Sequence, residues 1–408
     1  MMDQDDSDLV SVSEFSQEED ISQKDSDTDE GGKKKKKIKA EEIGSKESKS
    51  VFRAKMMVYL VLIVSCVTAA TLTYFFTSDQ EEDDFENDFK TFAEEISRVA
   101  KADLSAKFDV AESMSISTTS YAIERGDQFP YVTMPDFERR TQKAREMSGA
   151  ELITVTPLCD TDIITQWESY AQLESSWIQE GLAVQGLSSV NPGPVPLNIH
   201  PLLVEGEEIP PNEGILKGMV APCWQTGKAP INATIVNTDF LTWGTYLEVA
   251  TAVVQARKGF ISKIDDIPIT EMGYFDYHDR RRLSGEYPHS FILQPVYKDF
   301  LGTSIIVGLY MLVVPWDIYF QDILPEGTDG VEVVLSDSCG GTYTYELLGP
   351  VGNLKGEGDL HNTEYDKHRV SSQLTDQGSA TQCDYTLDIY PSDKLKNKYE
   401  SKDPLIFA

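Results

Sequence analysis

The clearest feature of the polarity pattern is one long apolar run near the N-terminus. Lys55 and Asp79 bracket 23 uncharged residues, whose apolar core is MMVYLVLIVSCVTAATLTYFF, residues 56–76. As a helix rising about 1.5 Å per residue, this core is about 30 Å long and matches the hydrocarbon thickness of a bilayer. A signal peptide is the alternative, but the run starts too late in the chain and is too long. We therefore predict a single transmembrane helix over 56–76, with the lipid bilayer as a partner.

A second pattern follows the apolar run directly. Apolar residues recur at spacings of four, three, four and three: Phe85, Phe89, Phe92, Ile96 and Val99. This periodicity predicts an amphipathic helix over about 82–116, within a helical stalk that spans 77–120. The apolar stripe of such a stalk packs against its own domain or against the stalk of a second subunit. Core packing is the commoner explanation, and a homodimer through the stalk helix is the alternative.

Beyond residue 120 the pattern mixes helices and strands. We expect helices at about 135–147, at 162–181 and within 236–257, a strand at 151–158 and a long loop at 186–214. The last third is rich in strands, expected at 289–297, 303–314, 330–335 and 343–348, with a short helix at 316–324. The run IIVGLYMLVV within 303–314 is too short to span a bilayer as a helix, so a buried strand is predicted. This order describes half of an antiparallel sheet with a helix on one face, which is an α+β fold.

The charge is distributed unevenly along the 408 residues and predicts an orientation. The chain has a formal net charge of -32, yet residues 31–55 carry ten Lys or Arg and three Glu. Residues 79–88, on the other side of the apolar run, contain no Lys or Arg. Basic flanks stay cytoplasmic, so we expect residues 1–55 to be a disordered cytosolic tail and residues 121–408 to form an exoplasmic domain at the plasma membrane.

The same charge and the cysteines bear on partners and compartment. Strong net negative charge excludes a general nucleic-acid binder, because neutralising phosphates needs a basic face. Four of the five cysteines, Cys159, Cys223, Cys339 and Cys383, lie in the predicted exoplasmic domain, where an even number suggests disulfides. Four cysteines allow three pairings. Asn232 begins an N-glycosylation sequon on the same side of the membrane.

A search for catalytic and metal-binding motifs is negative. The sequence lacks a phosphate loop, a dinucleotide fingerprint, a nucleophile elbow and paired zinc-ligand cysteines. No cofactor and no metal site is therefore predicted. The stretch GDLHNTEYDKH, residues 358–368, is a candidate metal cluster for which a polar turn is the favoured interpretation. The tripeptide at 125–127 and the arginines at 280–282 are likewise interpreted as exposed polar segments.

Aromatic residues supply the candidate ligand-binding positions. Tyr297 and Trp316 stand at ends of adjacent predicted strands, where a sheet can open onto a cavity. Trp224 and Arg139 complete the set of candidate ligand-binding residues. Core packing is the favoured role for each Trp taken singly. We expect the ligand to be an extracellular small molecule.

The domain order resembles that of receptor sensor modules, including the CHASE and Cache groups. The stretches FILQPVYKDF, VVPWDIYFQDILPEGTDGVEVVLSDSCGGTYTYELLGP and GEGDLHNTEYD are similar to the ectodomain of receptor-type class III nucleotide cyclases of microalgae. Two further stretches, YAIERGDQFPYVTMPDFERRTQKAREMSGAELITVTPL and CDYTLDIYPSDKLKNKYES, are similar to the same family. Together these stretches cover most of residues 85–402. The resemblance implies a PAS- or Cache-like antiparallel sheet with flanking helices.

The resemblance also implies disulfide pairs and a function. It implies that Cys339 pairs with Cys383, which leaves Cys159 paired with Cys223. The family continues into a second membrane helix and a cyclase domain, whereas this sequence reads DPLIFA over 403–408, so no catalytic residues are transferred and no enzyme is predicted. The expected function is a membrane-anchored extracellular sensor module. The alternative is a structural or adaptor membrane glycoprotein.

Overall fold

The computed structural model describes residues 33–188, 195–203, 206, 208–227, 235–265, 288–302, 304–375 and 383–399, with side chains from residue 51 onward. The chain divides into two compact units. One comprises Met1–Tyr74 with Ala408, and the other comprises Phe75–Phe407. The fold is a mixture of helices and antiparallel sheets, as the sequence predicts.

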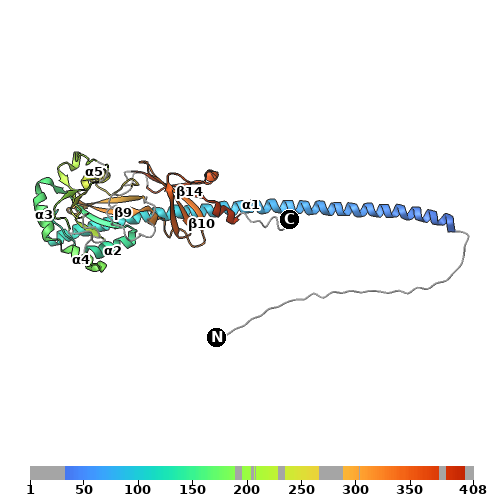
Figure 1. Ribbon diagram of the computed structural model, residues 1–408, viewed down its shortest axis with the longest axis horizontal. Helices are drawn as coiled ribbons and strands as arrows, with labels where there is room; N and C mark the ends of the chain where they lie inside the picture. The colour runs from blue at the N-terminus through green and yellow to red at the C-terminus, as the bar shows by residue number, and fades with distance from the viewer. Residues whose placement is uncertain are drawn as a thin grey trace, which may run out of the picture. The chain divides into compact units, whose positions relative to one another are not determined.

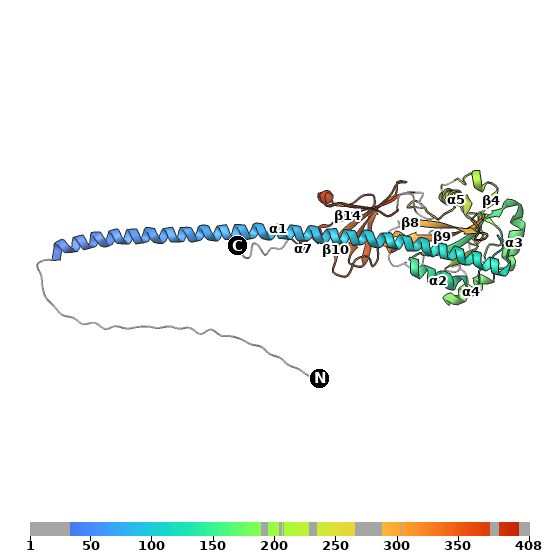
Figure 2. The same ribbon diagram turned by 180° about the vertical axis from the view of Figure 1, so that it is seen from behind.

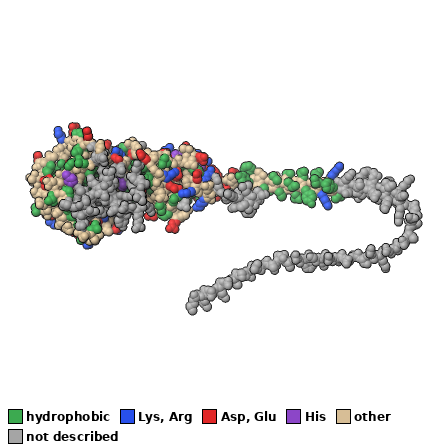
Figure 3. Space-filling view, in the orientation of Figure 1, with side chains coloured by type: hydrophobic (Ala, Val, Ile, Leu, Met, Phe, Trp, Pro, Cys, Tyr) green, Lys and Arg blue, Asp and Glu red, His purple; other side chains and the backbone are tan. Residues whose placement is uncertain are grey.

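The first helix, α1, runs from Lys33 to Arg125. It contains an apolar segment of which none is buried. Almost every side chain of residues 56–76 is exposed, and Figure 3 shows these apolar side chains with Lys and Arg at their N-terminal end. By length and composition this segment can cross a membrane.

The first sheet of the Phe75–Phe407 unit is antiparallel throughout, with the strand order β5-β1-β9-β8-β7. Its strands are β1 (Leu152–Pro157), β5 (Gln225–Gly227), β7 (Phe260–Ile261), β8 (His289–Tyr297) and β9 (Ile306–Pro315). Helices cover both faces, since α1 and α2 (Phe137–Ser148) lie against one face and α5 (Gly244–Ala256) lies against the other (Figure 1).

Alternation along β9 explains why this strand is continuously apolar. Tyr310 and Leu312 belong to the core that includes α1, whereas Leu309 and Met311 belong to the core that includes α5. Successive side chains of a strand point to opposite faces, so a sheet covered on both faces needs apolar residues at every position. The predicted buried strand is confirmed, with the bounds Ile306–Pro315 in place of the predicted 303–314.

The second sheet is also antiparallel, with the order β12-β11-β10-β14-β13. Its strands are β10 (Asp329–Asp337), β11 (Thr342–Leu348), β12 (Val351–Glu357), β13 (Val370–Gln373) and β14 (Tyr385–Pro391). One face joins the core that α1 shares, through Val333, Tyr345 and Leu387. Figure 2 shows α1 running alongside both sheets.

The remaining elements are short. They are β2 (Cys159–Asp160), η1 (Thr161–Ile163), α3 (Ile164–Leu173), α4 (Ser176–Gln185), β3 (His200–Pro201), η2 (Gly214–Leu216), β4 (Met219–Val220), β6 (Thr238–Asp239), η4 (Phe240–Thr242), α6 (Trp316–Tyr319), η7 (Thr363–His368) and α7 (Asp393–Tyr399). Strands β2 and β4 pair antiparallel, and β3 and β6 pair parallel.

The stripe of α1 is buried within its own unit. Phe85, Phe89 and Ile96 are at most 3% exposed and belong to the core formed with the second sheet. Farther along, the Ser115 hydroxyl donates to the Pro295 carbonyl at 2.6 Å, which ties α1 to β8. Core packing thus accounts for the stripe, and the homodimer stays a prediction.

Three expectations about the fold are corrected. The four strands predicted for the last third do not share one sheet: β8 and β9 belong to the first sheet, and β10 and β11 belong to the second. The helix expected over 162–181 is interrupted at residues 174–175, between α3 and α4. The helix expected over 316–324 ends at Tyr319.

Candidate functional site

A cavity of about 400 Å³ lies at the C-terminal end of α1. It is lined by Tyr121, Arg125, Asp127, Tyr131, Thr133, Met134, Pro135, Tyr170, Glu174, Ser176, Trp177 and Glu180. We call this the α1-end cavity. Its walls come from the last turn of α1, the segment that follows α1, and helices α3 and α4. Its volume is within the range of small-molecule sites in proteins.

Local backbone geometry creates the opening. Gly126 has φ +75°, a left-handed conformation that glycine adopts without strain, and it ends α1. The next residue, Asp127, donates its backbone N–H to the Ala122 carbonyl at 3.0 Å. The chain then turns back along the helix end. The break between α3 and α4 places Glu174 and Ser176 in the lining of the cavity.

The walls of the α1-end cavity are rich in aromatic rings. The Tyr131 and Tyr170 rings are 5.4 Å apart, and the Tyr170 hydroxyl forms a 2.5 Å hydrogen bond with Thr133 Oγ1. The Trp177 ring meets Trp224 edge to face at 5.8 Å. Burial raises the pKa of Tyr170, so its hydroxyl stays protonated and neutral at physiological pH. The cluster forms a rigid aromatic wall.

Carboxylates outnumber cations around the α1-end cavity. Asp127, Glu174 and Glu180 face a single arginine, Arg125, whose Nε is 3.4 Å from Asp127 Oδ2. Glu180 accepts the Asp136 backbone N–H at 3.0 Å. Within the described residues no ion pair forms on Glu174. The lining therefore carries a formal charge of -2.

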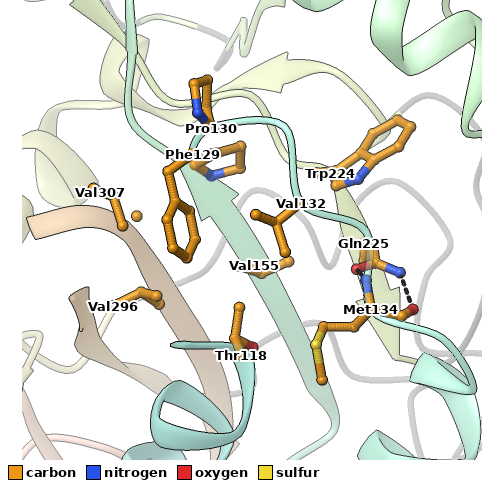
Figure 4. A pocket seen from close by; sticks show the side chains of 12 residues that line it. Thr118, Phe129, Pro130, Val132, Met134, Val155, Trp224, Gln225, Val296 and Val307 are labelled. Atoms are coloured by element: carbon orange, nitrogen blue, oxygen red, sulfur yellow. Dashed lines mark hydrogen bonds between the residues drawn. The ribbon is translucent and has the colours of Figure 1, made fainter. Parts of the chain in front are cut away.

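A smaller apolar cavity of about 20 Å³ lies beside the first (Figure 4). Thr118 of α1, Phe129, Val155 of β1 and Val307 of β9 line it, and Met134 lines both cavities. The Gln225 side chain fixes the Met134 backbone, since its Oε1 accepts from the Met134 N–H at 2.7 Å and its Nε2 donates to the Met134 carbonyl at 2.8 Å. This space has room for about one water molecule.

The predicted ligand-binding residues do not converge. Tyr297 pairs with Ile306 at one end of the β8–β9 hairpin, whereas His289 pairs with Pro315, next to Trp316, at the other end. Trp316 is fully buried and donates its indole N–H to Ser290 Oγ at 2.9 Å. The Tyr297 hydroxyl donates to the Arg257 carbonyl at 2.5 Å.

The other two candidates lie nearer the cavities. Trp224 lines the smaller cavity and donates its indole N–H to Thr133 Oγ1 at 3.0 Å, directly behind the α1-end cavity. Arg139 is exposed on α2, 3.7 Å from Asp136, and lines neither cavity. Of the four predicted ligand-binding residues, Trp224 alone lines one of the two cavities and contacts a residue of the other.

The cysteine predictions divide into one confirmed and one wrong pair. Cys339 and Cys383 form a disulfide with a Cα–Cα distance of 5.7 Å, which links the turn after β10 to the start of β14. Cys159 and Cys223 are instead both free and buried. The Cys223 sulfur is 3.1 Å from Thr154 Oγ1, and burial raises its pKa to about 12. An apolar core position accounts for a reduced, inert thiol.

The structure also describes two of the polar segments that the sequence analysis considered, at 358–368 and at 125–127. In the 358–368 stretch, His361 hydrogen-bonds Asp359 through Nδ1 and Asp366 through Nε2, so both ring nitrogens are occupied within one polar turn. Arg125 and Asp127 belong to the α1-end cavity. Asn232 and the arginines at 280–282 lie outside the described residues.

Most of the α1-end cavity was not found by sequence reasoning. Two sequence features belong to it: an Arg-Gly-Asp sequence at the end of a long helix, and the aromatic and acidic residues interleaved in ITQWESYAQLESSWIQE, residues 164–180. These segments meet only after folding. No protein-family model matches the chain, and no curated protein matches it.

Proposed function

We propose that this chain is a membrane-anchored sensor that binds a small organic cation in the α1-end cavity. The observation that carries the proposal is that α1 itself supplies Tyr121 and Arg125 to the cavity wall. The same helix contains the apolar segment that can cross a membrane. A ligand that contacts the last turn of α1 therefore acts directly on the element that leads toward the bilayer.

The chemistry of the lining favours a cationic ligand. Aromatic faces attract cations through the ring quadrupole, and three carboxylates against one arginine add a favourable potential. Glu174 is the carboxylate best suited to pair with an ammonium group. Asp127 already lies beside Arg125 and Glu180 accepts the Asp136 backbone N–H, whereas no described residue forms an ion pair with Glu174. The cavity volume suits an amine the size of an amino acid or larger.

Signalling requires that the ligand favour one arrangement of α1 over another, since only differential affinity shifts an equilibrium. The PAS- or Cache-like character, the extracellular placement at the plasma membrane and the relation to receptor cyclases are parts of this proposal that rest on the sequence motifs and flanking charges. They predict a cytosolic N-terminus and a glycan on Asn232. A glycosidase-induced mobility shift of the Asn232 form, lost in Asn232→Gln, tests this orientation.

Binding is tested with the full chain in neutral-lipid nanodiscs. Thermal unfolding is followed with a panel of primary and quaternary amines, matched carboxylic acids and neutral sugars, because a ligand that binds only the folded state raises its stability. We expect stabilisation by amines alone. Glu174→Gln is expected to weaken amine binding about tenfold, the loss of one charge interaction at short range. The matched control Asp109→Asn, on the exposed face of α1, is expected to bind normally.

Transmission needs a separate measurement. Amide hydrogen exchange at residues 118–125 is compared with and without the amine that stabilises the protein most. We expect slower exchange in the last turns of α1. Binding without any change in α1 exchange would refute the sensor mechanism while leaving the ligand site intact, and stabilisation by none of the amines would refute the site.

A further inference from the structure

A second cluster of charged residues lies at the other end of the same unit, where α1 passes η7. Glu82 and Glu86 are one turn apart on α1, and His368 ends η7. The possible ligand atoms of these three side chains all lie within 4.8 Å of one another. Residues four apart on a helix share a face, so both glutamates point toward the histidine. The cluster joins two segments that are almost 300 residues apart.

His368 is placed unusually for a polar side chain. Its side chain is only 7% exposed, yet within the described residues neither ring nitrogen makes a hydrogen bond. The nearest acceptor, Glu86 Oε1, is 3.8 Å from Nδ1, beyond hydrogen-bond range. The ring is held in position by Phe85, which it meets edge to face at 5.3 Å. Its Nδ1 faces the Glu86 carboxylate at ion-pair distance, so a metal ion can be accommodated between the two groups.

We propose that Glu82, Glu86 and His368 bind a divalent transition-metal ion such as Zn²⁺, which fastens α1 to η7. One imidazole and two carboxylates are a ligand set that Zn²⁺ accepts, with water in the fourth position. Tetrahedral Zn²⁺ with bonds of about 2.0–2.2 Å sets its ligand atoms about 3.4 Å apart. The three groups therefore need to approach by no more than about 1.4 Å, which glutamate side chains that are half exposed can do by rotation.

The charged residues around the cluster favour binding of a cation, and one of them, Lys367, competes with a metal ion for Glu82. Residues 79–88 contain seven carboxylates and no Lys or Arg. Lys367 Nζ lies 3.4 Å from Glu82 Oε1 and is the one described lysine paired with the cluster. A metal ion has to displace this ammonium group from Glu82. Removal of the Lys367 charge is therefore expected to strengthen metal binding, whereas a purely structural role of the cluster predicts no such gain.

The test uses the full chain in neutral-lipid nanodiscs after treatment with EDTA. Zn²⁺ alone is titrated against a chromophoric chelator, and Co²⁺ is added separately because its visible absorption reports tetrahedral coordination. Glu86→Gln and His368→Phe each remove one ligand atom, and the phenyl ring retains the packing on Phe85. We expect each variant to bind Zn²⁺ at least about tenfold more weakly, in line with the loss of a metal contact.

The control and the cation variant make the outcome decisive. Asp83→Asn removes the same charge one residue from Glu82 and is expected to leave Zn²⁺ affinity within about twofold. Lys367→Gln is expected to raise the affinity several-fold. If Glu86→Gln binds Zn²⁺ as tightly as the wild type, or if Lys367→Gln binds more weakly, the site is refuted. Glu86 is exposed, so its variant folds even if the histidine variant does not.

Discussion

The packing of α1 against its own unit leads to a quantitative prediction about Ile96. This side chain is fully buried in the core shared by α1 and the sheets. Ile96→Ala removes three buried carbon atoms, and large-to-Ala changes at such sites cost about 2–5 kcal/mol of the free energy of unfolding. Alanine has the higher helix propensity, which offsets roughly 0.4 kcal/mol of the lost free energy of unfolding. We expect a net loss of about 3 kcal/mol.

The matched control lies on the same helix. Ile116 is 48% exposed, so Ile116→Ala loses about half as much buried area as Ile96→Ala and gains the same helix propensity. We expect its free energy of unfolding to fall by about 1 kcal/mol, well below the loss for Ile96→Ala. The comparison separates burial from any general effect of changing isoleucine to alanine in a helix.

The assay is urea unfolding of the full chain in nanodiscs, followed by tryptophan fluorescence. All five tryptophans lie between residues 167 and 316, so the signal reports the Phe75–Phe407 unit. For a slope near 3 kcal/mol/M, a loss of about 3 kcal/mol lowers the midpoint by about 1 M. Equal midpoints for the two variants would contradict the burial argument. A loss that grows on dilution would instead assign the stripe to a dimer, because dimer stability depends on protein concentration.

Three further predictions concern the disulfide and the charged groups. Replacing Cys339 and Cys383 by alanine, across a sequence separation of 44, is expected to cost about 4 kcal/mol from loop-closure entropy, measured by urea unfolding. Asp103→Asn removes the partner that lies 2.6 Å from buried Lys107 and is expected to cost about 1–3 kcal/mol, whereas Lys107→Met is expected to stay within about 1 kcal/mol of wild type. Burial lowers the pKa of His361, but hydrogen bonds to two aspartates outweigh this effect and raise the pKa above its ordinary value. The contribution of His361 to stability is therefore complete below about pH 6.5 and is lost as pH rises through the raised pKa. Unfolding of His361→Gln and of the wild type should differ more at about pH 5 than at about pH 8.

Local periodicity was enough to predict the elements that bury a regular pattern. The α1 stripe and the continuous apolar run of β9 each identified the correct element, because burial on one helix face or on both sheet faces repeats at a fixed spacing. The β8–β9 pairing followed from two neighbouring strand patterns. What periodicity cannot supply is the assignment of strands to sheets, since β10 pairs with β14, about 50 residues away.

The predicted ligand-binding residues failed for a related reason. Tyr297 and Trp316 were expected at ends of adjacent strands, where a sheet can open onto a cavity. An antiparallel hairpin, however, places the start of one strand beside the end of the next. They are therefore separated by the length of the strands, roughly 25 Å for eight residues at about 3.3 Å each. The α1-end cavity instead combines residues 121–135 with 170–180, and no local sequence pattern predicts that these two segments are in contact.

The two proposed sites act on one helix at its two ends within the same unit. Tyr121 and Arg125 place the organic-cation site on the last turn of α1, and Glu82 and Glu86 place the metal site about ten turns earlier. Between them the helix is held by buried contacts, including Ile96 and the Ser115 hydrogen bond to Pro295. A packed helix transmits a small shift as a rigid element rather than absorbing it. A metal ion that fastens α1 at Glu86 should therefore oppose any shift that ligand binding produces at Tyr121. We expect amine affinity to fall when Zn²⁺ is bound. Because coupling between two sites is reciprocal, Zn²⁺ affinity should fall by the same factor when the amine is bound.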